Sequence, residues 1–189
     1  GTATVSISIL HYCKHSNNGS KISDVDHELY KLLSNDGNSF VGCAIQGLGF
    51  VVSEEEALFL RSNNEGDVVW PFLTADDINS NPKSSASREI IFFKNMDLTL
   101  AKQYPEAFHI VQSRVKPYRE TVRRKAHRVR WWQYGDWRPG LYGKISLLQK
   151  VIVTGITSKY HVFVVVSAKQ VFDQTTVVIL KASFSHFAL

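Results

Sequence analysis

The chain has 189 residues, of which 44% are hydrophobic, enough for the core of one domain or of two small ones. No stretch approaches the roughly 18–20 apolar residues that a membrane span needs, and no signal peptide is visible. The two cysteines, Cys13 and Cys43, do not make a disulfide framework, which indicates a reducing, cytoplasmic setting. The chain begins at Gly1 without a Met and ends on the apolar Leu189, so we expect a fragment of a larger protein.

The positive charge is concentrated in one part of the chain. The net charge is +5, but residues 114–138 alone carry +7, so the rest of the chain is slightly acidic. The basic residues of this window are Arg114, Lys116, Arg119, Arg123, Arg124, Lys125, Arg128, Arg130 and Arg138. One-sided charge of this kind is typical of a surface that binds a polyanion.

The first half of the chain predicts short strands and one well-capped helix. Alternation predicts a strand at Val5–Ile9, and one or two strands are expected in 40–52. Ser53 and Glu56 form a capping-box pattern, which predicts a helix through about Arg61. A strand is expected at 67–70 and is predicted to stop at Pro71, and the polar stretch 74–88 is predicted to be a surface loop.

The second half mixes helices with β-branched strands. We expect a strand at 89–93, a helix from about Leu98, and a second helix starting at Pro105. Residues 114–130 are predicted to be helical in two pieces around Pro117. Strands are expected at 150–153, 161–166 and 176–180. The pattern predicts one α+β domain over 1–189, with a mixed, mainly antiparallel sheet and packed helices.

The basic segment predicts contact with nucleic acid. Phosphates are bound by rows of cations, because each neutralised phosphate releases counterions. A solvated helix face is the alternative, but such faces usually carry mixed signs. The candidate DNA-binding residues are Arg119, Arg123, Arg124, Lys125, Arg128, Arg130 and Arg138.

Three of the four tryptophans, Trp131, Trp132 and Trp137, follow the basic segment directly. Indoles can stack on bases, but buried aromatics dominate core energetics, so we favour a structural role.

Two further patterns point to other chemistry and are weak. His11, Cys13 and His15 would share one face of a strand, as metal ligands do, but no fourth ligand follows. Gly47-Leu48-Gly49 resembles the start of a nucleotide loop, but the acidic helix start after it would repel a phosphate. We therefore expect no catalytic residues, no metal and no cofactor in this chain.

The order of the motifs resembles the target recognition domain of the MmeI-like restriction-modification enzymes, type IIG, subclass IIL. The matching stretches are Phe40–Gly42, Gly47–Phe50, Ser53–Ala57, Trp70–Leu73, Asp76–Ile78, Arg88–Phe93, Ala101–Pro105, Val115–Arg119, Trp131-Trp132, Arg138-Pro139, Ser158 and Phe184–Leu189. In place of the family's Ile-Asp-Phe this chain has Ile91-Phe92-Phe93.

The resemblance implies a module that binds double-stranded DNA and reads a short site. The parent would be a bacterial, S-adenosylmethionine-dependent adenine methyltransferase, with or without a fused endonuclease, and its catalytic domain would be covalently linked to this one. An RNA or single-strand binding domain and a small metal-dependent enzyme are the alternatives.

Specificity is expected partly in Ser158–His161. Lys159 and His161 would point the same way on an extended chain and can both hydrogen-bond base edges. The resemblance implies base-reading residues two apart in a late stretch, which Lys159 and His161 match. The alternative is that Lys159 is a solvated residue and His161 a partly buried one. In that case the base-reading residues are expected first in the stretch 74–88.

Overall fold

The structure is a computed structural model that describes residues 37–159 and 162–180. The strands are β1 (Ser39–Val41), β2 (Val51–Val52), β3 (Val69–Leu73), β4 (Arg88–Ile91), β5 (Lys150–Gly155), β6 (Val164–Ser167), β7 (Val171–Phe172) and β8 (Thr176–Ile179). The helices are α1 (Glu54–Ser62), α2 (Ala75–Ser80), α3 (Leu98–Ala101), α4 (Pro105–Arg114), α5 (Lys116–Thr121), α6 (Lys125–Val129) and α7 (Pro139–Ile145), with 3-10 turns η2 (Leu48–Phe50) and η3 (Gly66–Val68). The strand predicted at Val5–Ile9 lies outside the described residues.

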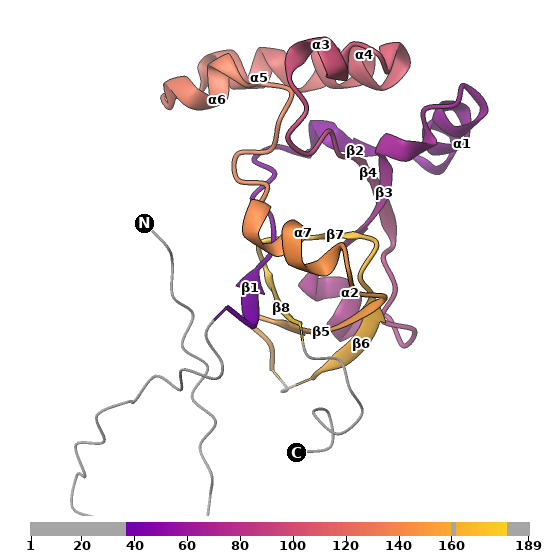
Figure 1. The fold of residues 1–189 in the computed structure, drawn as a ribbon, viewed down its shortest axis with the longest axis vertical. Helices are drawn as coiled ribbons and strands as arrows, with labels where there is room; N and C mark the ends of the chain where they lie inside the picture. Colours follow the sequence, from indigo (N-terminus) through magenta and orange to yellow (C-terminus); the bar gives the residue numbers. More distant parts are fainter. Residues whose placement is uncertain (1–36, 160–161, 181–189) are drawn as a thin grey trace, which may run out of the picture.

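The α+β class is confirmed, with the strands divided between two sheets. One sheet has the order β1-β8-β5-β6 and is antiparallel throughout. The other has the order β2-β4-β3-β7, in which only β3 and β7 run parallel. Figure 1 shows α3 to α6 gathered at one end of the molecule, while α2 lies beside β5 and β6 at the other.

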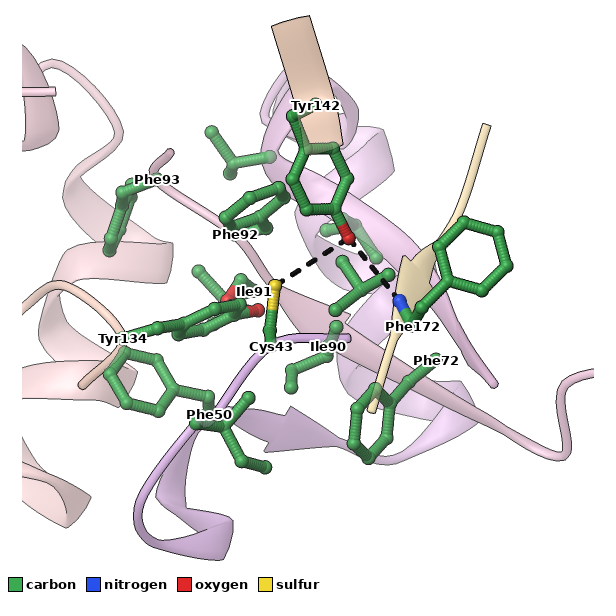
Figure 2. Close-up of a cluster of buried hydrophobic side chains, with 14 of the residues drawn as sticks. Cys43, Phe50, Phe72, Ile90, Ile91, Phe92, Phe93, Tyr134, Tyr142 and Phe172 are labelled. Carbon is green, nitrogen blue, oxygen red and sulfur yellow. Dashed lines mark hydrogen bonds between the residues drawn. The ribbon is translucent and has the colours of Figure 1, made fainter. Parts of the chain in front are cut away.

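The core is rich in aromatic side chains and lies around Cys43 (Figure 2). The Phe92 and Tyr134 rings stack with their centroids 4.8 Å apart. The Cys43 thiol donates to the Tyr142 hydroxyl at 3.7 Å, and that hydroxyl accepts from the Phe172 amide at 3.2 Å. Burial raises the pKa of Cys43 to about 12, so the thiol is a packing group and not a nucleophile.

Helix caps explain one confirmed prediction and one wrong one. The capping box of Ser53 and Glu56 is present at the start of α1, as predicted. The stretch 74–88 is not all loop, because Thr74 and Asp77 make a second capping box that starts α2. Asp77 stands at the third helical position in place of the usual Glu or Gln, so the usual capping-box pattern of sequence does not include it.

The prediction that Pro71 ends its strand is wrong, because Pro71 lies inside β3 opposite Glu89. The Phe92 amide donates to the Val68 carbonyl at 2.8 Å, and hydrogen-bonded pairs alternate along an antiparallel ladder. Pro71 therefore occupies a non-hydrogen-bonded position relative to β4. On its other side β7 pairs with β3 only from Phe72 onward, so the missing amide proton costs no ladder bond.

The basic segment is helical, with the predicted boundary near Pro117 and a second one that was not predicted. α4 ends at Arg114, and Pro117 lies in the first turn of α5, where it costs no helical hydrogen bond. The additional break comes at 122–124, between α5 and α6. α7 was not predicted, although Pro139 stands at its start. Within residues 37–159 and 162–180, no helix is long and apolar enough to span a membrane.

Candidate nucleic-acid interface

The cationic segment, defined here as Arg123 to Arg130, covers α6 and the turn before it. Its five cations, Arg123, Arg124, Lys125, Arg128 and Arg130, are all exposed. Arg128 donates to the backbone carbonyls of Val122 and Arg123, at 2.7 and 3.0 Å. No carboxylate in the described part of the chain forms an ion pair with any of the five. Within residues 37–159 and 162–180, the segment is therefore a surface of uncompensated positive charge.

Two other basic residues of the window are already paired. Arg114 forms a salt bridge with Glu56 of α1. Arg138 pairs with Asp136 at 2.9 Å, and its Nε donates to the Gly42 carbonyl at 3.2 Å. Arg138 remains partly exposed, but neutralisation by Asp136 makes it a weaker phosphate ligand than the cationic segment.

The structure separates Arg119 from the other candidates, because its side chain is completely buried. Its Nη2 donates to the carbonyls of Ile45, at 2.8 Å, and Gln133, at 3.2 Å. Burial lowers the pKa of Arg119, and its Nε and Nη1 have no partner within the described residues. Arg119 cannot reach a phosphate from this position, so it is a structural residue and leaves the set of candidate DNA contacts.

His127 is a buried residue of α6 that sequence reasoning did not single out. Its Nδ1 has no partner among the described residues, and its ring lines a pocket of about 200 Å³ with Arg124 and Arg130. Its pKa is lowered first by burial and then by the charges of Arg119 and Arg124. No sequence signal marked it, because a histidine in a basic run looks like one more surface cation.

The tryptophans pack against the protein. Trp132 is 9% exposed, and its indole N–H donates to the Met96 carbonyl at 3.0 Å. Trp131 is half-buried, with its ring centroid 5.3 Å from that of Phe108. The predicted structural role is confirmed for Trp132, and Trp131 belongs to the edge of the same cluster.

A cleft of about 550 Å³ lies where the two sheets meet, and we call it the inter-sheet cleft. Its walls come from five parts of the chain. They are Ile45–Leu48, the β3–α2 junction, Arg88 of β4, the residues after β5, and the turn Asp173–Thr175. The amide of Gln46 packs so closely on Gly135 that a Cβ atom there would lie 2.8 Å from Gln46 Cδ. Gly135 in turn lines the small pocket of Arg124 and Arg130, so the cleft adjoins the cationic segment.

The residues that lead into the late stretch proposed to read bases line this cleft. Ile156 and Thr157 line it, and the Ser158 hydroxyl donates to the Asn79 side chain of α2 at 2.9 Å. Ser158, the first residue of that stretch, is thus a neighbour of the stretch 74–88 in space. Lys159 follows directly, whereas His161 lies outside the described residues.

The two weaker sequence patterns add no site among the described residues. His11, Cys13 and His15 lie outside the described residues, and the rest of the chain that the structure describes holds no metal-like group of three His, Cys, Asp or Glu. Gly49 is a packing glycine, because a Cβ atom there would lie 2.8 Å from Val115 Cγ2.

The chain therefore has an α+β fold with two four-stranded sheets, and it carries an exposed cationic segment. No protein-family model matches the chain, and no curated protein does. The fold is similar to part of a solved structure of the type IIL restriction-modification enzyme MmeI in complex with DNA, with a TM-score of 0.59 and 14% sequence identity. The similarity covers 79% of this chain and 20% of that one, so the chain spans about a fifth of the MmeI structure.

Proposed function

We propose that this chain binds duplex DNA and reads a short site in it, as the target recognition domain of a bacterial type IIG restriction-modification enzyme. The catalytic domain of that enzyme would be covalently linked to this one, hold S-adenosylmethionine and methylate an adenine. The chain itself would supply DNA recognition and no catalytic group.

The observation that carries the proposal is the cationic segment. Five exposed cations fall within eight consecutive residues, and none is neutralised by a carboxylate among the described residues. Exposed unpaired cations gain from phosphate contact without first breaking an ion pair. Phosphate contacts set the register of a protein on DNA and carry no sequence information, so base reading needs a second surface.

Lys159 and His161 are proposed to be part of that second surface. Supporting this, the Ser158 hydroxyl donates to Asn79 of α2, and Ile156 and Thr157 just before it line the inter-sheet cleft. Lys159 could donate to the N7 and O6 acceptors of a guanine, and His161 could donate or accept at a base edge.

Single-strand binding is the less favoured alternative. It needs exposed aromatic platforms on which bases can stack. Trp132 is buried and Trp131 packs against Phe108, so two of the tryptophans next to the cationic segment are engaged with the protein.

The test is the salt dependence of duplex binding by the purified chain. With about four to six phosphates neutralised, log affinity should fall against log salt with a slope of roughly −4 to −5. The triple variant Arg123→Ala, Lys125→Ala, Arg130→Ala should reduce the magnitude of the slope by about 3. Lys83→Ala, Lys102→Ala, Lys169→Ala is the charge-matched control and should keep the parent slope. A flat salt dependence, or tighter binding to single strands than to duplex, would contradict the proposal.

Catalytic activity gives an independent test of the domain assignment. The chain alone should transfer no radiolabelled methyl group from S-adenosylmethionine to DNA. Transfer by this chain would show that it is not merely the recognition domain.

A further inference from the structure

Arg88 is an exposed cation inside the inter-sheet cleft. It is the first residue of β4, and its guanidinium carbon lies 5.6 Å from the centroid of the Phe72 ring. The next residue, Glu89, pairs with Arg61 of α1 instead. Within the described residues no carboxylate pairs with Arg88, so its five N–H donors remain available to a ligand. Stacking on Phe72 restricts the orientation of the guanidinium plane before any ligand binds.

The other polar groups of the cleft are mixed in charge and in hydrogen-bonding type. Gln46, Asp76 and Gln174 are exposed in its walls. The Asp173 carboxylate is already occupied, because it accepts from the amide and hydroxyl of Thr175 at 3.1 and 2.7 Å. An exposed acid such as Asp76 disfavours a phosphate, whereas base edges in the major groove present both donors and acceptors. The cleft is therefore better matched to the edges of DNA bases, and the cationic segment is better matched to the phosphates of the DNA backbone.

The walls of the cleft are held together by hydrogen bonds between distant segments. The Ala75 amide donates to Thr175 Oγ1 at 3.2 Å, and the Ile156 amide donates to the Thr175 carbonyl at 2.8 Å. The Asp173 amide donates to the Leu73 carbonyl at 2.9 Å. These bonds tie α2, the end of β5 and the 173–175 turn into one frame, which is what a preorganised recognition site requires.

The cleft is also tied to the cationic segment. Buried Arg119 of α5 donates to the Ile45 carbonyl, which fixes the start of one cleft wall. The next residue, Gln46, packs on Gly135 beside Arg124 and Arg130. The contact between Gln46 and Gly135 therefore joins the cleft to the pocket beside the cationic segment.

We propose that Arg88 is a specificity-determining residue, which donates to the N7 and O6 of one guanine in the major groove. This assignment rests on the proposed function, and it names a base-reading residue outside the late stretch that contains Lys159.

The experiment is selection of preferred sites from a random duplex library by the purified chain, followed by affinity measurements on the selected site. The unmodified chain should select a site with a fixed G·C pair. Arg88→Ala should lower the preference at that one position by about tenfold or more and keep the preference elsewhere. Arg88→Lys should also reduce the preference although it keeps the charge, because an ammonium lacks the planar fork of donors that stacking on Phe72 holds in one orientation. Arg123→Ala is the control, and should weaken all sequences alike.

The outcomes separate this assignment from the proposed function. Equal weakening of all sequences by Arg88→Ala would make Arg88 a phosphate contact and overturn the assignment, as would an unchanged preference. Salt-dependent binding by the unmodified chain without any selected sequence would leave the DNA-binding proposal standing and remove the assignment. No duplex binding even at low salt would remove both. Because Arg88→Ala could also disturb β4, Arg88→Gln, with retained urea stability, provides a second variant that must show the same local loss.

Discussion

The Nη2 of Arg119 donates to the backbone carbonyl of Ile45 at 2.8 Å, across 74 residues of sequence. One residue of a strongly basic stretch is therefore buried to hold a wall of the inter-sheet cleft, while its neighbours in the cationic segment face solvent. Basic residues of one stretch therefore have two roles, structural support for Arg119 and surface charge for the cationic segment. Mutations at the two kinds of position should have different effects.

Arg119→Ala should destabilise the fold and leave the salt dependence of DNA binding unchanged. The variant loses hydrogen bonds to Ile45 and Gln133 and leaves a cavity, at a cost of about 3 kcal/mol or more in unfolding free energy. Urea denaturation checks this. The exposed Arg123→Ala is the control and should stay within about 0.5 kcal/mol of the parent. A drop in salt slope for folded Arg119→Ala would place Arg119 at the DNA after all.

Trp132→Ala should act on stability and not on DNA contact. Loss of its burial and of its hydrogen bond to Met96 should cost about 3–5 kcal/mol. Trp131→Ala should cost less, because Trp131 is only half-buried. Thermal melts and duplex affinity, measured below the melting transition, distinguish the two effects. Variants that melt like the parent but lose duplex affinity would favour a stacking role.

His127 should make the fold less stable in mild acid. Its pKa is lowered in the folded state by burial, and by Arg119 and Arg124, so folding favours the neutral ring. The stabilisation is complete above the unfolded pKa of about 6.5, and is lost as the pH falls toward the lower folded pKa. The unfolding free energy should therefore fall between about pH 7 and pH 5. His127→Gln should flatten this dependence, and the exposed His109→Gln should not. Equal slopes for the two variants would contradict the prediction.

Glu65 should be more important for stability than its place in a loop suggests. Its buried carboxylate accepts from the amides of Glu106 and Ala107, at 3.1 and 2.7 Å, and so caps the start of α4. Glu65→Ala should cost about 2–3 kcal/mol, because the buried Ala107 amide and the partly buried Glu106 amide both lose their acceptor. Glu55→Ala, at an exposed position, serves as the comparison in the same denaturation experiment. Indistinguishable midpoints for the two variants would exclude this capping role.

Two glycines should respond in opposite directions to alanine. A Cβ atom at Gly42 would lie 2.1 Å from the Asp173 carbonyl oxygen, so Gly42→Ala should unfold or severely destabilise the chain. Gly143 lies within α7 with nothing within 4 Å of such an atom, so Gly143→Ala should stabilise by about 0.5–1 kcal/mol. Expression level and melting temperature distinguish them. A Gly42→Ala chain as stable as the parent would contradict the close packing at this junction.

The sequence by itself determined the features that depend on residues near one another in the chain. The capping box of Ser53 and Glu56 and the helix start at Pro105 were predicted correctly. The strands predicted at 89–93 and 150–153 are present as Arg88–Ile91 and Lys150–Gly155. Each rests on interactions or steric limits within a few residues, so the local pattern is sufficient. The concentration of positive charge in residues 114–138 could also be predicted from the sequence, because it depends only on residues that are close together in the chain.

Only the tertiary structure decided which of the basic residues are available and where the candidate reading surface lies. Arg119 and Arg123 look alike in sequence, but one is buried against Ile45 and the other is exposed. β1 pairs with β8, with Ser39 opposite Ile179, and the cleft walls come from segments equally far apart. Burial and pairing of this kind depend on how distant segments pack, and neither periodicity nor charge along the chain contains that information.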